Sequence, residues 1–146
     1  MVSRQRAAAV NRIRSLSILL ADDTLELRAL FTAWLEEAGH TVRVASNGTE
    51  VVQLMEEQPF DLVVTDILMP GGDGWDAITA VQRLHPGVRI LAISGGARQM
   101  PASAVLRVAH RAGALGFLAK PFARPAFLDA VNSVMTRNIP RVKRAL

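Results

Sequence analysis

The chain has 146 residues, half of them hydrophobic, which suits one globular domain with a full core. It lacks cysteine, which excludes disulfide frameworks and thiolate metal sites, and its apolar runs are too short to span a bilayer. The net charge of +4 comes from a basic N-terminal extension, 1–14, and a basic C-terminal tail, 139–146, because residues 15–138 hold 10 basic and 13 acidic residues. We therefore expect no nucleic-acid binding and no membrane attachment, and the lack of a signal peptide points to the cytoplasm.

Hydrophobic patterning predicts five strands that alternate with five helices. The predicted strands are 16–21, 41–45, 62–66, 88–93 and 116–119. The predicted helices are 24–38, 47–58, 74–84, 102–112 and 124–137. This alternation implies one α/β domain over 15–138, with a parallel sheet, right-handed crossovers and helices on both faces.

Local signals refine three of these elements. The first helix has an apolar stripe at 3.6-residue spacing, formed by Leu27, Leu30, Phe31, Trp34 and Leu35. Asp23 could cap that helix with Glu26 three residues on, and Asn47 with Glu50 forms the same pattern before the second helix. Residues 41–45 alternate in polarity, which is typical of a half-exposed edge strand.

The third predicted strand delivers Asp66 to the rim of the sheet. Leu62, Val63 and Val64 show no polar alternation, so this strand is expected to be buried on both faces. The proline and glycines that follow Met69 exclude regular structure there, so the strand ends at Asp66. In open parallel α/β sheets, ligands and chemistry are found at this carboxyl rim.

Other strand ends add polar side chains to the same rim: Asp22 and Asp23, Ser94, and Lys120. Three carboxylates repel one another unless a hard cation binds, and all-oxygen ligands favour Mg²⁺ or Mn²⁺. With the lysine beside them, the set suits phosphoryl transfer, in which Asp66 acts as the nucleophile and Ser94 binds a phosphoryl oxygen. Each residue alone also fits a helix cap, a turn or a surface charge, but the ordered combination favours a site.

These residues resemble the signature of the response-regulator receiver domain of two-component signalling. The resemblance covers roughly residues 16–138 and rests on Asp22-Asp23, Asp66, Met69-Pro70, Gly74, Ser94 and Lys120-Pro121-Phe122. It implies a flavodoxin-like sheet of order 2-1-3-4-5. It also implies that a histidine kinase or histidine phosphotransfer protein phosphorylates Asp66. Asp23, Asp66 and the backbone carbonyl of Leu68 would bind Mg²⁺, with Asp22 acting partly through water, and Lys120 would contact the phosphoryl group.

The resemblance further implies a switch. Ser94 would be drawn toward the phosphoryl group and Phe117 would turn inward, while the Lys120–Pro121 peptide bond would be cis. The face formed by 102–112, 116–119 and 124–137 would then change its partners, which are a downstream protein and a second copy in a homodimer. A receiver catalyses only its own phosphorylation and dephosphorylation, so it is not otherwise an enzyme.

The chain departs from the family pattern in three places. Ser94 replaces the commoner threonine and keeps its hydroxyl. Gly72 stands where the family often has methionine, and residues 95–101 form the expected insertion between Ser94 and Lys120. Leu68 and Gly96 occupy the positions that tune dephosphorylation, and neither can orient a water, so we expect slow self-dephosphorylation. We also expect Trp75, just past the site loop, to report phosphorylation by fluorescence.

Three other interpretations stay open. A degenerate receiver would act as a phosphorylation-independent interaction module. A metal-dependent phosphohydrolase would need a carboxylate two residues after the nucleophile, where this chain has Leu68. A flavin- or nucleotide-binding module would need a phosphate loop where Asp22-Asp23 stands. Nine residues follow Arg137, so we expect a stand-alone receiver or a relay between histidines if the printed sequence is the whole protein.

Overall fold

The computed structural model describes residues 14–69, 74–95 and 101–137. Its strands are β1 (Ser17–Ala21), β2 (Thr41–Ala45), β3 (Leu62–Asp66), β4 (Arg89–Ser94) and β5 (Gly116–Ala119). The helices in these ranges are α2 (Leu25–Glu37), α3 (Gly48–Glu57), α4 (Gly74–Leu84), α5 (Ala102–Ala112) and α6 (Arg124–Thr136). All strand pairs are parallel, in the order β2-β1-β3-β4-β5, so the predicted flavodoxin-like fold is confirmed.

Several predictions fall outside the described residues. They concern the two basic ends, except for Arg14, together with Gly72, Gly96 and most of the expected insertion over 95–101. None of the helices in the described ranges is long and apolar enough to cross a membrane.

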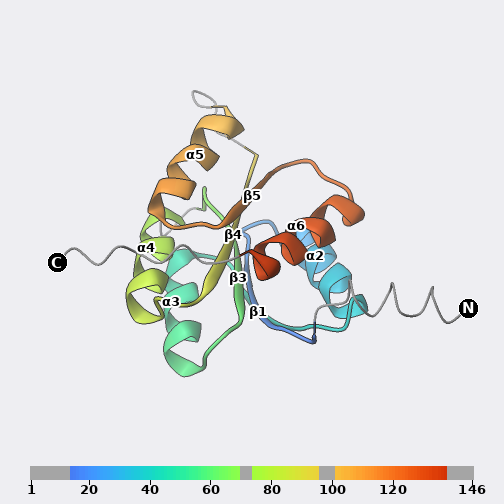
Figure 1. The fold of residues 1–146 in the computed structure, drawn as a ribbon, viewed down its shortest axis with the longest axis horizontal. Coiled ribbons are helices and arrows are strands. Elements are labelled where there is room, and N and C mark those ends of the chain that lie inside the picture. Colours follow the sequence, from blue (N-terminus) through green and yellow to red (C-terminus); the bar gives the residue numbers. More distant parts are fainter. Residues whose placement is uncertain (1–13, 70–73, 96–100, 138–146) are drawn as a thin grey trace, which may run out of the picture.

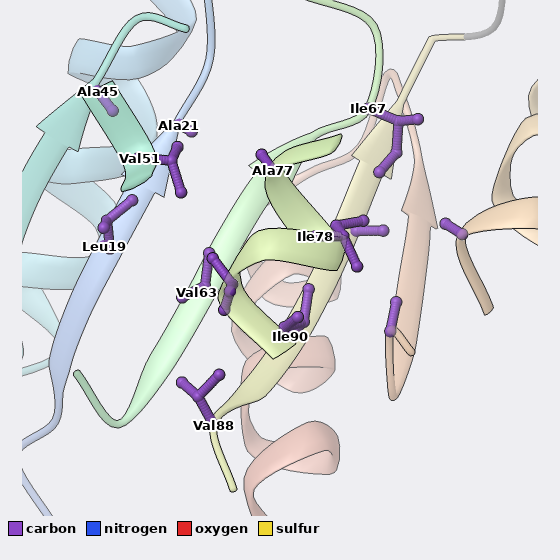
Figure 2. Close-up of a cluster of buried hydrophobic side chains, with 14 of the residues drawn as sticks. Leu19, Ala21, Ala45, Val51, Val63, Ile67, Ala77, Ile78, Val88 and Ile90 are labelled. Atoms are coloured by element: carbon purple, nitrogen blue, oxygen red, sulfur yellow. The ribbon is translucent and has the colours of Figure 1, made fainter. Parts of the chain in front are cut away.

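The helices form two layers around the sheet. Helices α3, α4 and α5 lie on one face, and α2 and α6 lie on the other (Figure 1). Successive side chains of a strand point to opposite faces, so each central strand contributes to both layers. Leu19, Val63 and Ile90 are buried in the core between the sheet and the layer of α3, α4 and α5 (Figure 2). Their neighbours Leu20, Val64 and Leu91 enter the core below α2 and α6.

The two predicted helix starts have different outcomes. Asn47 caps α3 as predicted, because its side-chain oxygen accepts the Glu50 N–H at 2.9 Å. Glu50 in turn accepts the backbone N–H of Ser46 at 2.6 Å. The prediction that Asp23 caps α2 is wrong: the helix begins after Thr24, whose side chain makes no capping bond. The N–H of Thr24 bonds instead to the buried carboxylate of Asp22.

The apolar stripe of α2 was also predicted too broadly. Phe31 and Leu35 are buried against the sheet, whereas Leu30 is 43% exposed. The reason lies in the neighbouring helix, because the Phe31 ring stacks on Phe127 of α6, with ring centroids 5.1 Å apart. That contact fixes the rotation of α2 about its axis and leaves Leu30 facing outward.

The edges of the sheet are β2 and β5. The predicted edge position of residues 41–45 is confirmed, and Val44 there is 46% exposed. At the other edge, β5 alternates between half-buried and exposed residues. Gly116 allows α6 to approach this strand, because a Cβ at that position would lie only 2.4 Å from a methyl carbon of Val134. The next residue, Phe117, is exposed.

Candidate functional site

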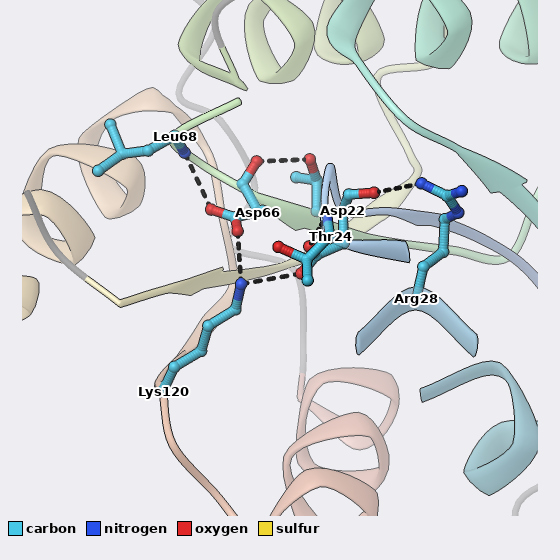
Figure 3. A network of polar contacts seen from close by, with 7 residues as sticks. Asp22, Thr24, Arg28, Asp66, Leu68 and Lys120 are labelled. Carbon is cyan, nitrogen blue, oxygen red and sulfur yellow. Dashed lines mark hydrogen bonds and ion pairs between the residues drawn. The ribbon is translucent and has the colours of Figure 1, made fainter. Parts of the chain in front are cut away.

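The rim of the sheet brings Asp22, Asp66 and Lys120 into direct contact. Asp22 follows β1, Asp66 is the last residue of β3, and Lys120 follows β5. The ammonium nitrogen of Lys120 lies 2.6 Å from Asp66 Oδ2 and 2.9 Å from Asp22 Oδ2 (Figure 3). One cation therefore bridges two buried carboxylates from neighbouring strands, as the order of strand ends had suggested.

For both Asp66 and Lys120, burial shifts the pKa in one direction and the contact with the oppositely charged partner shifts it in the other. Burial raises the pKa of Asp66 by more than the hydrogen bonds from Lys120 and the Leu68 N–H, at 3.0 Å, lower it. Burial lowers the pKa of Lys120, but the bonds and charges of Asp66 and Asp22 outweigh it, so this pKa lies above its usual value. Lys120 therefore stays protonated beside a desolvated carboxylate.

Backbone and side-chain donors fix Asp22. Its Oδ1 accepts the Thr24 N–H at 2.9 Å, and Nη1 of Arg28 donates to its backbone carbonyl at 2.9 Å. The Asp22 N–H also donates to the carbonyl of Ala45 in β2 at 3.1 Å. Neither Thr24 nor Arg28 was among the site residues predicted from the sequence. The signal that could have found Arg28 was a basic residue in the first turns of the helix that follows the acidic pair.

Three carboxylates at this rim fit a hard cation. Asp22, Asp23 and Asp66 each offer an oxygen, and these oxygens lie within 4.8 Å of one another. Asp23 is exposed, so a cation can reach the cluster from solvent. Asp22 Oδ2 is buried and lies against the ammonium of Lys120. An oxygen-only donor set with spare acceptor capacity could hold a divalent metal.

Ser94 and the Lys120–Pro121 peptide bond adjoin this centre, whereas Phe117 lies beside α5. Ser94 is buried at the end of β4, and its carbonyl accepts the Lys120 N–H at 2.9 Å. The Lys120–Pro121 bond is cis, the isomer that the resemblance implied. Phe117 lies on β5 with half of its surface exposed, edge-on to His110 at a ring distance of 6.4 Å. The side chain of Trp75 lies outside the described structure.

Comparison with known proteins identifies the family. The family model described as response regulator receiver domain matches residues 18–132. The chain belongs to this family. Its receiver fold is shared with chemotaxis protein CheY4 of Vibrio cholerae, with a TM-score of 0.73, 25% identity, and coverage of 83% of this chain and 99% of that one.

Sequence relatives include both short and long proteins. The receiver is 34% identical over 119 residues to chemotaxis protein CheY of Halobacterium salinarum, covering 82% of this chain and 96% of that protein. It is 31% identical over 124 residues to the DNA-binding transcriptional regulator NtrC of Azospirillum brasilense, covering 85% of this chain and 25% of that protein. An acidic pocket with Lys120 in a receiver domain is consistent with phosphoacceptor function. Receivers interact with histidine kinases and are not enzymes in the ordinary sense.

Proposed function

We propose that Asp66 is the phosphoacceptor of this receiver and takes its phosphoryl group from a histidine kinase or a histidine phosphotransfer protein. The observation that carries this proposal is the position of Asp66, held between the ammonium of Lys120 and the acidic cluster with Asp22 and Asp23. A carboxylate oxygen of Asp66 attacks the phosphorus, the phosphorus–nitrogen bond to histidine breaks, and its electron pair returns to the imidazole. The product is an acyl phosphate on Asp66.

The neighbouring residues have separate roles in this proposal. Lys120 releases Asp66 as the bond forms and contacts a phosphoryl oxygen, which offsets the added negative charge. Ser94, at the end of the adjacent strand β4, donates its hydroxyl to another phosphoryl oxygen. Backbone donors at Thr24 and Leu68 keep the carboxylates of Asp22 and Asp66 in place.

Asp22, Asp23, Asp66 and the carbonyl of Leu68 would hold Mg²⁺, or Mn²⁺ in its place. When bound, the ion neutralises charge on the transferred group. The oxygen-only donor set and the clustering of three carboxylates support this assignment. The family supports the choice of Mg²⁺ and a cytoplasmic location.

Phosphorylation is proposed to change the face formed by α5, β5 and α6. Ser94 would move toward the phosphoryl group and Phe117 would turn inward from its half-exposed position. Lys120 and Ser94 are linked by a backbone hydrogen bond, so a movement of either one is transmitted to β5. A downstream protein, or a second copy of the chain, would bind this face.

The apolar side chain of Leu68 leads us to expect slow hydrolysis of the phosphoryl group on Asp66. This partly buried side chain lies two residues after Asp66 and cannot orient a water for attack. A phosphoryl lifetime well beyond seconds in the presence of Mg²⁺ is the expected result, and a lifetime of seconds or less would contradict it. The same residue argues against a phosphohydrolase, which needs a general acid at this position.

Beryllofluoride, a phosphoryl mimic, tests the proposal without a kinase. With Mg²⁺ present, the amide NMR signals of Ser94, Phe117 and Lys120 should shift in the wild-type chain and stay in place in Asp66→Asn. Thermal unfolding of the variant confirms that it is folded. If the wild-type signals do not respond, the chain is a phosphorylation-independent interaction module.

A further inference from the structure

Acidic and basic residues are divided between the two halves of the receiver. Residues 15–76 hold 12 acidic residues, whereas residues 77–128 hold none and carry seven cations. Helix α5 and strand β5 lie entirely within this acid-free segment and stand together at one edge of the sheet (Figure 1). This edge therefore has a cationic character, although residues 15–138 as a whole carry more acids than bases.

A cavity of about 460 Å³ lies at this edge, lined by Ser103, Arg107, His110, Phe117 and Arg137. Arg107 and His110 are exposed on one side of α5, and Phe117 stands on β5 beside the His110 ring. Arg137 follows α6, where Nη1 donates to the carbonyl of Leu115 and so holds the guanidinium against the start of β5. The cavity thus combines an aromatic wall with two guanidinium groups, one from α5 and one from the end of α6.

The arginines of this cavity lack an acidic partner within the described ranges. Arg43 and Arg124 pair with Glu57 and Glu37 elsewhere on the surface. Neither Arg107 nor Arg137 meets a carboxylate in residues 14–69, 74–95 and 101–137. Phe117, half exposed in the same cavity, leaves apolar surface in water. Carboxylates beside an apolar side chain would complement both features.

We propose that this cavity is the docking site for an acidic protein segment with an apolar anchor, in which a leucine or aromatic side chain packs on Phe117 and flanking carboxylates pair with Arg107 and Arg137. A nucleic acid fits less well, because it needs a track of several phosphate contacts and this cavity offers two guanidinium groups. This inference deepens the proposed function, on which it rests for the identification of the bound segment as the downstream partner.

The test uses isotope-labelled full-length chain without any phosphodonor. The probe is an eight-residue peptide that alternates glutamate and leucine, and its controls replace glutamate by glutamine or leucine by alanine. The acidic peptide should shift the amide signals of α5 and β5 and bind at least about tenfold more tightly than either control. Equal binding of the glutamine peptide, or absence of binding by all three, would overturn the proposal.

Matched variants locate the site. Arg107→Glu and Phe117→Ala should each weaken binding of the acidic peptide by about tenfold or more. Arg83→Glu makes the same charge change at an exposed position of α4 and should leave binding within about twofold. If Arg83→Glu weakened peptide binding equally, the loss in Arg107→Glu would reflect net charge and not a contact in the cavity, which would overturn the proposed site. If an eight-nucleotide single strand bound more tightly than the acidic peptide, the occupant would be a nucleic acid. If the chain dimerised and Arg107→Glu abolished this, the occupant would be a second copy of the chain.

A second titration separates this inference from the proposed function. Beryllofluoride and Mg²⁺ should change the affinity for the acidic peptide if phosphorylation switches this face. Unchanged affinity would contradict the switching role but leave acidic-segment binding in place. Loss of peptide binding under both conditions would contradict the docking site, whatever happens at Asp66.

Discussion

The ammonium of Lys120 lies 2.6 Å from Asp66 Oδ2, although the two positions are 54 apart in sequence. The contact exists because β3 and β5 are parallel strands on either side of β4, so their carboxyl ends meet at one rim. The same ammonium holds Asp22 at 2.9 Å, which makes Lys120 the central cation of the site. Any anionic group that reaches Asp66 must therefore meet this lysine.

Replacement of this cation should impair phosphoryl transfer. In Lys120→Met, the side chain keeps similar length but cannot neutralise charge on the transferred group. The rate of phosphorylation by acetyl phosphate should fall about 100-fold or more, the usual cost of losing one donor to a transition state. Arg124→Met, which removes a surface cation paired with Glu37, is the control and should react at the wild-type rate. Comparable rates in the two variants would remove Lys120 from the mechanism.

Divalent metal should stabilise the folded chain through the acidic cluster. Mg²⁺ at 100 times its dissociation constant should raise the free energy of unfolding by about 2.7 kcal/mol, and chelation should reverse this. Asp23→Asn should abolish most of the gain, because Asp23 completes the three-carboxylate set. Asp129→Asn removes an exposed acid on α6 and should retain it. A similar gain in Asp23→Asn, measured by thermal unfolding, would contradict the assignment.

His40 should make stability fall at mildly acidic pH. It is buried, its Nδ1 accepts the Leu16 N–H at 3.1 Å, and burial lowers its pKa from the usual 6.5. The unfolded chain therefore takes up a proton first, so stability is full above pH 6.5 and is lost as pH falls toward the folded-state pKa. The slope contributed by one group cannot exceed about 1.4 kcal/mol per pH unit.

His40→Asn isolates this contribution, because its amide oxygen can still accept the Leu16 N–H but does not titrate. Denaturant unfolding between about pH 7 and pH 5 should show a steeper loss of stability in the wild-type chain than in the variant. Parallel pH profiles for the two proteins would rule out His40 as the source. The remaining titrating groups are common to both, so their contributions cancel in the comparison.

The close approach of β5 and α6 should make Gly116 intolerant of a side chain. A Cβ in Gly116→Ala would lie 2.4 Å from a methyl carbon of buried Val134 and 3.4 Å from Leu91. The resulting overpacking should cost about 1–3 kcal/mol of unfolding free energy. Gly87→Ala is the matched control, since its Cβ would meet no atom within 4 Å. Equal stability of the two variants would show that α6 can move away freely.

Much of the fold and of the site could be predicted from the sequence, because both depend on strand ends. Apolar runs located β3 and β4, and parallel strands must bring Asp66 and Ser94 to the same rim. Local capping at Asn47 was also predictable, since it involves residues three apart.

Details that depend on burial and on helix packing were not predictable. Asp23 matched a capping pattern, but Asp22 is buried and its own carboxylate accepts the Thr24 N–H instead. The exposure of Leu30 depends on how Phe31 stacks against α6, which no periodicity encodes. The hydrogen bond from Arg28 to the Asp22 carbonyl likewise depends on how the chain turns between β1 and α2, which the residue pattern does not indicate.

Intact-mass measurement of phosphorylation at Asp66 tests the central claim most directly. The wild-type chain, incubated with acetyl phosphate and Mg²⁺, should gain one phosphoryl group that peptide mapping places on Asp66. The gain should disappear on chelation and in Asp66→Asn, and should persist in Asp129→Asn. An unmodified wild-type chain, or modification of Asp66→Asn to the same extent, would contradict the assignment of Asp66 as phosphoacceptor.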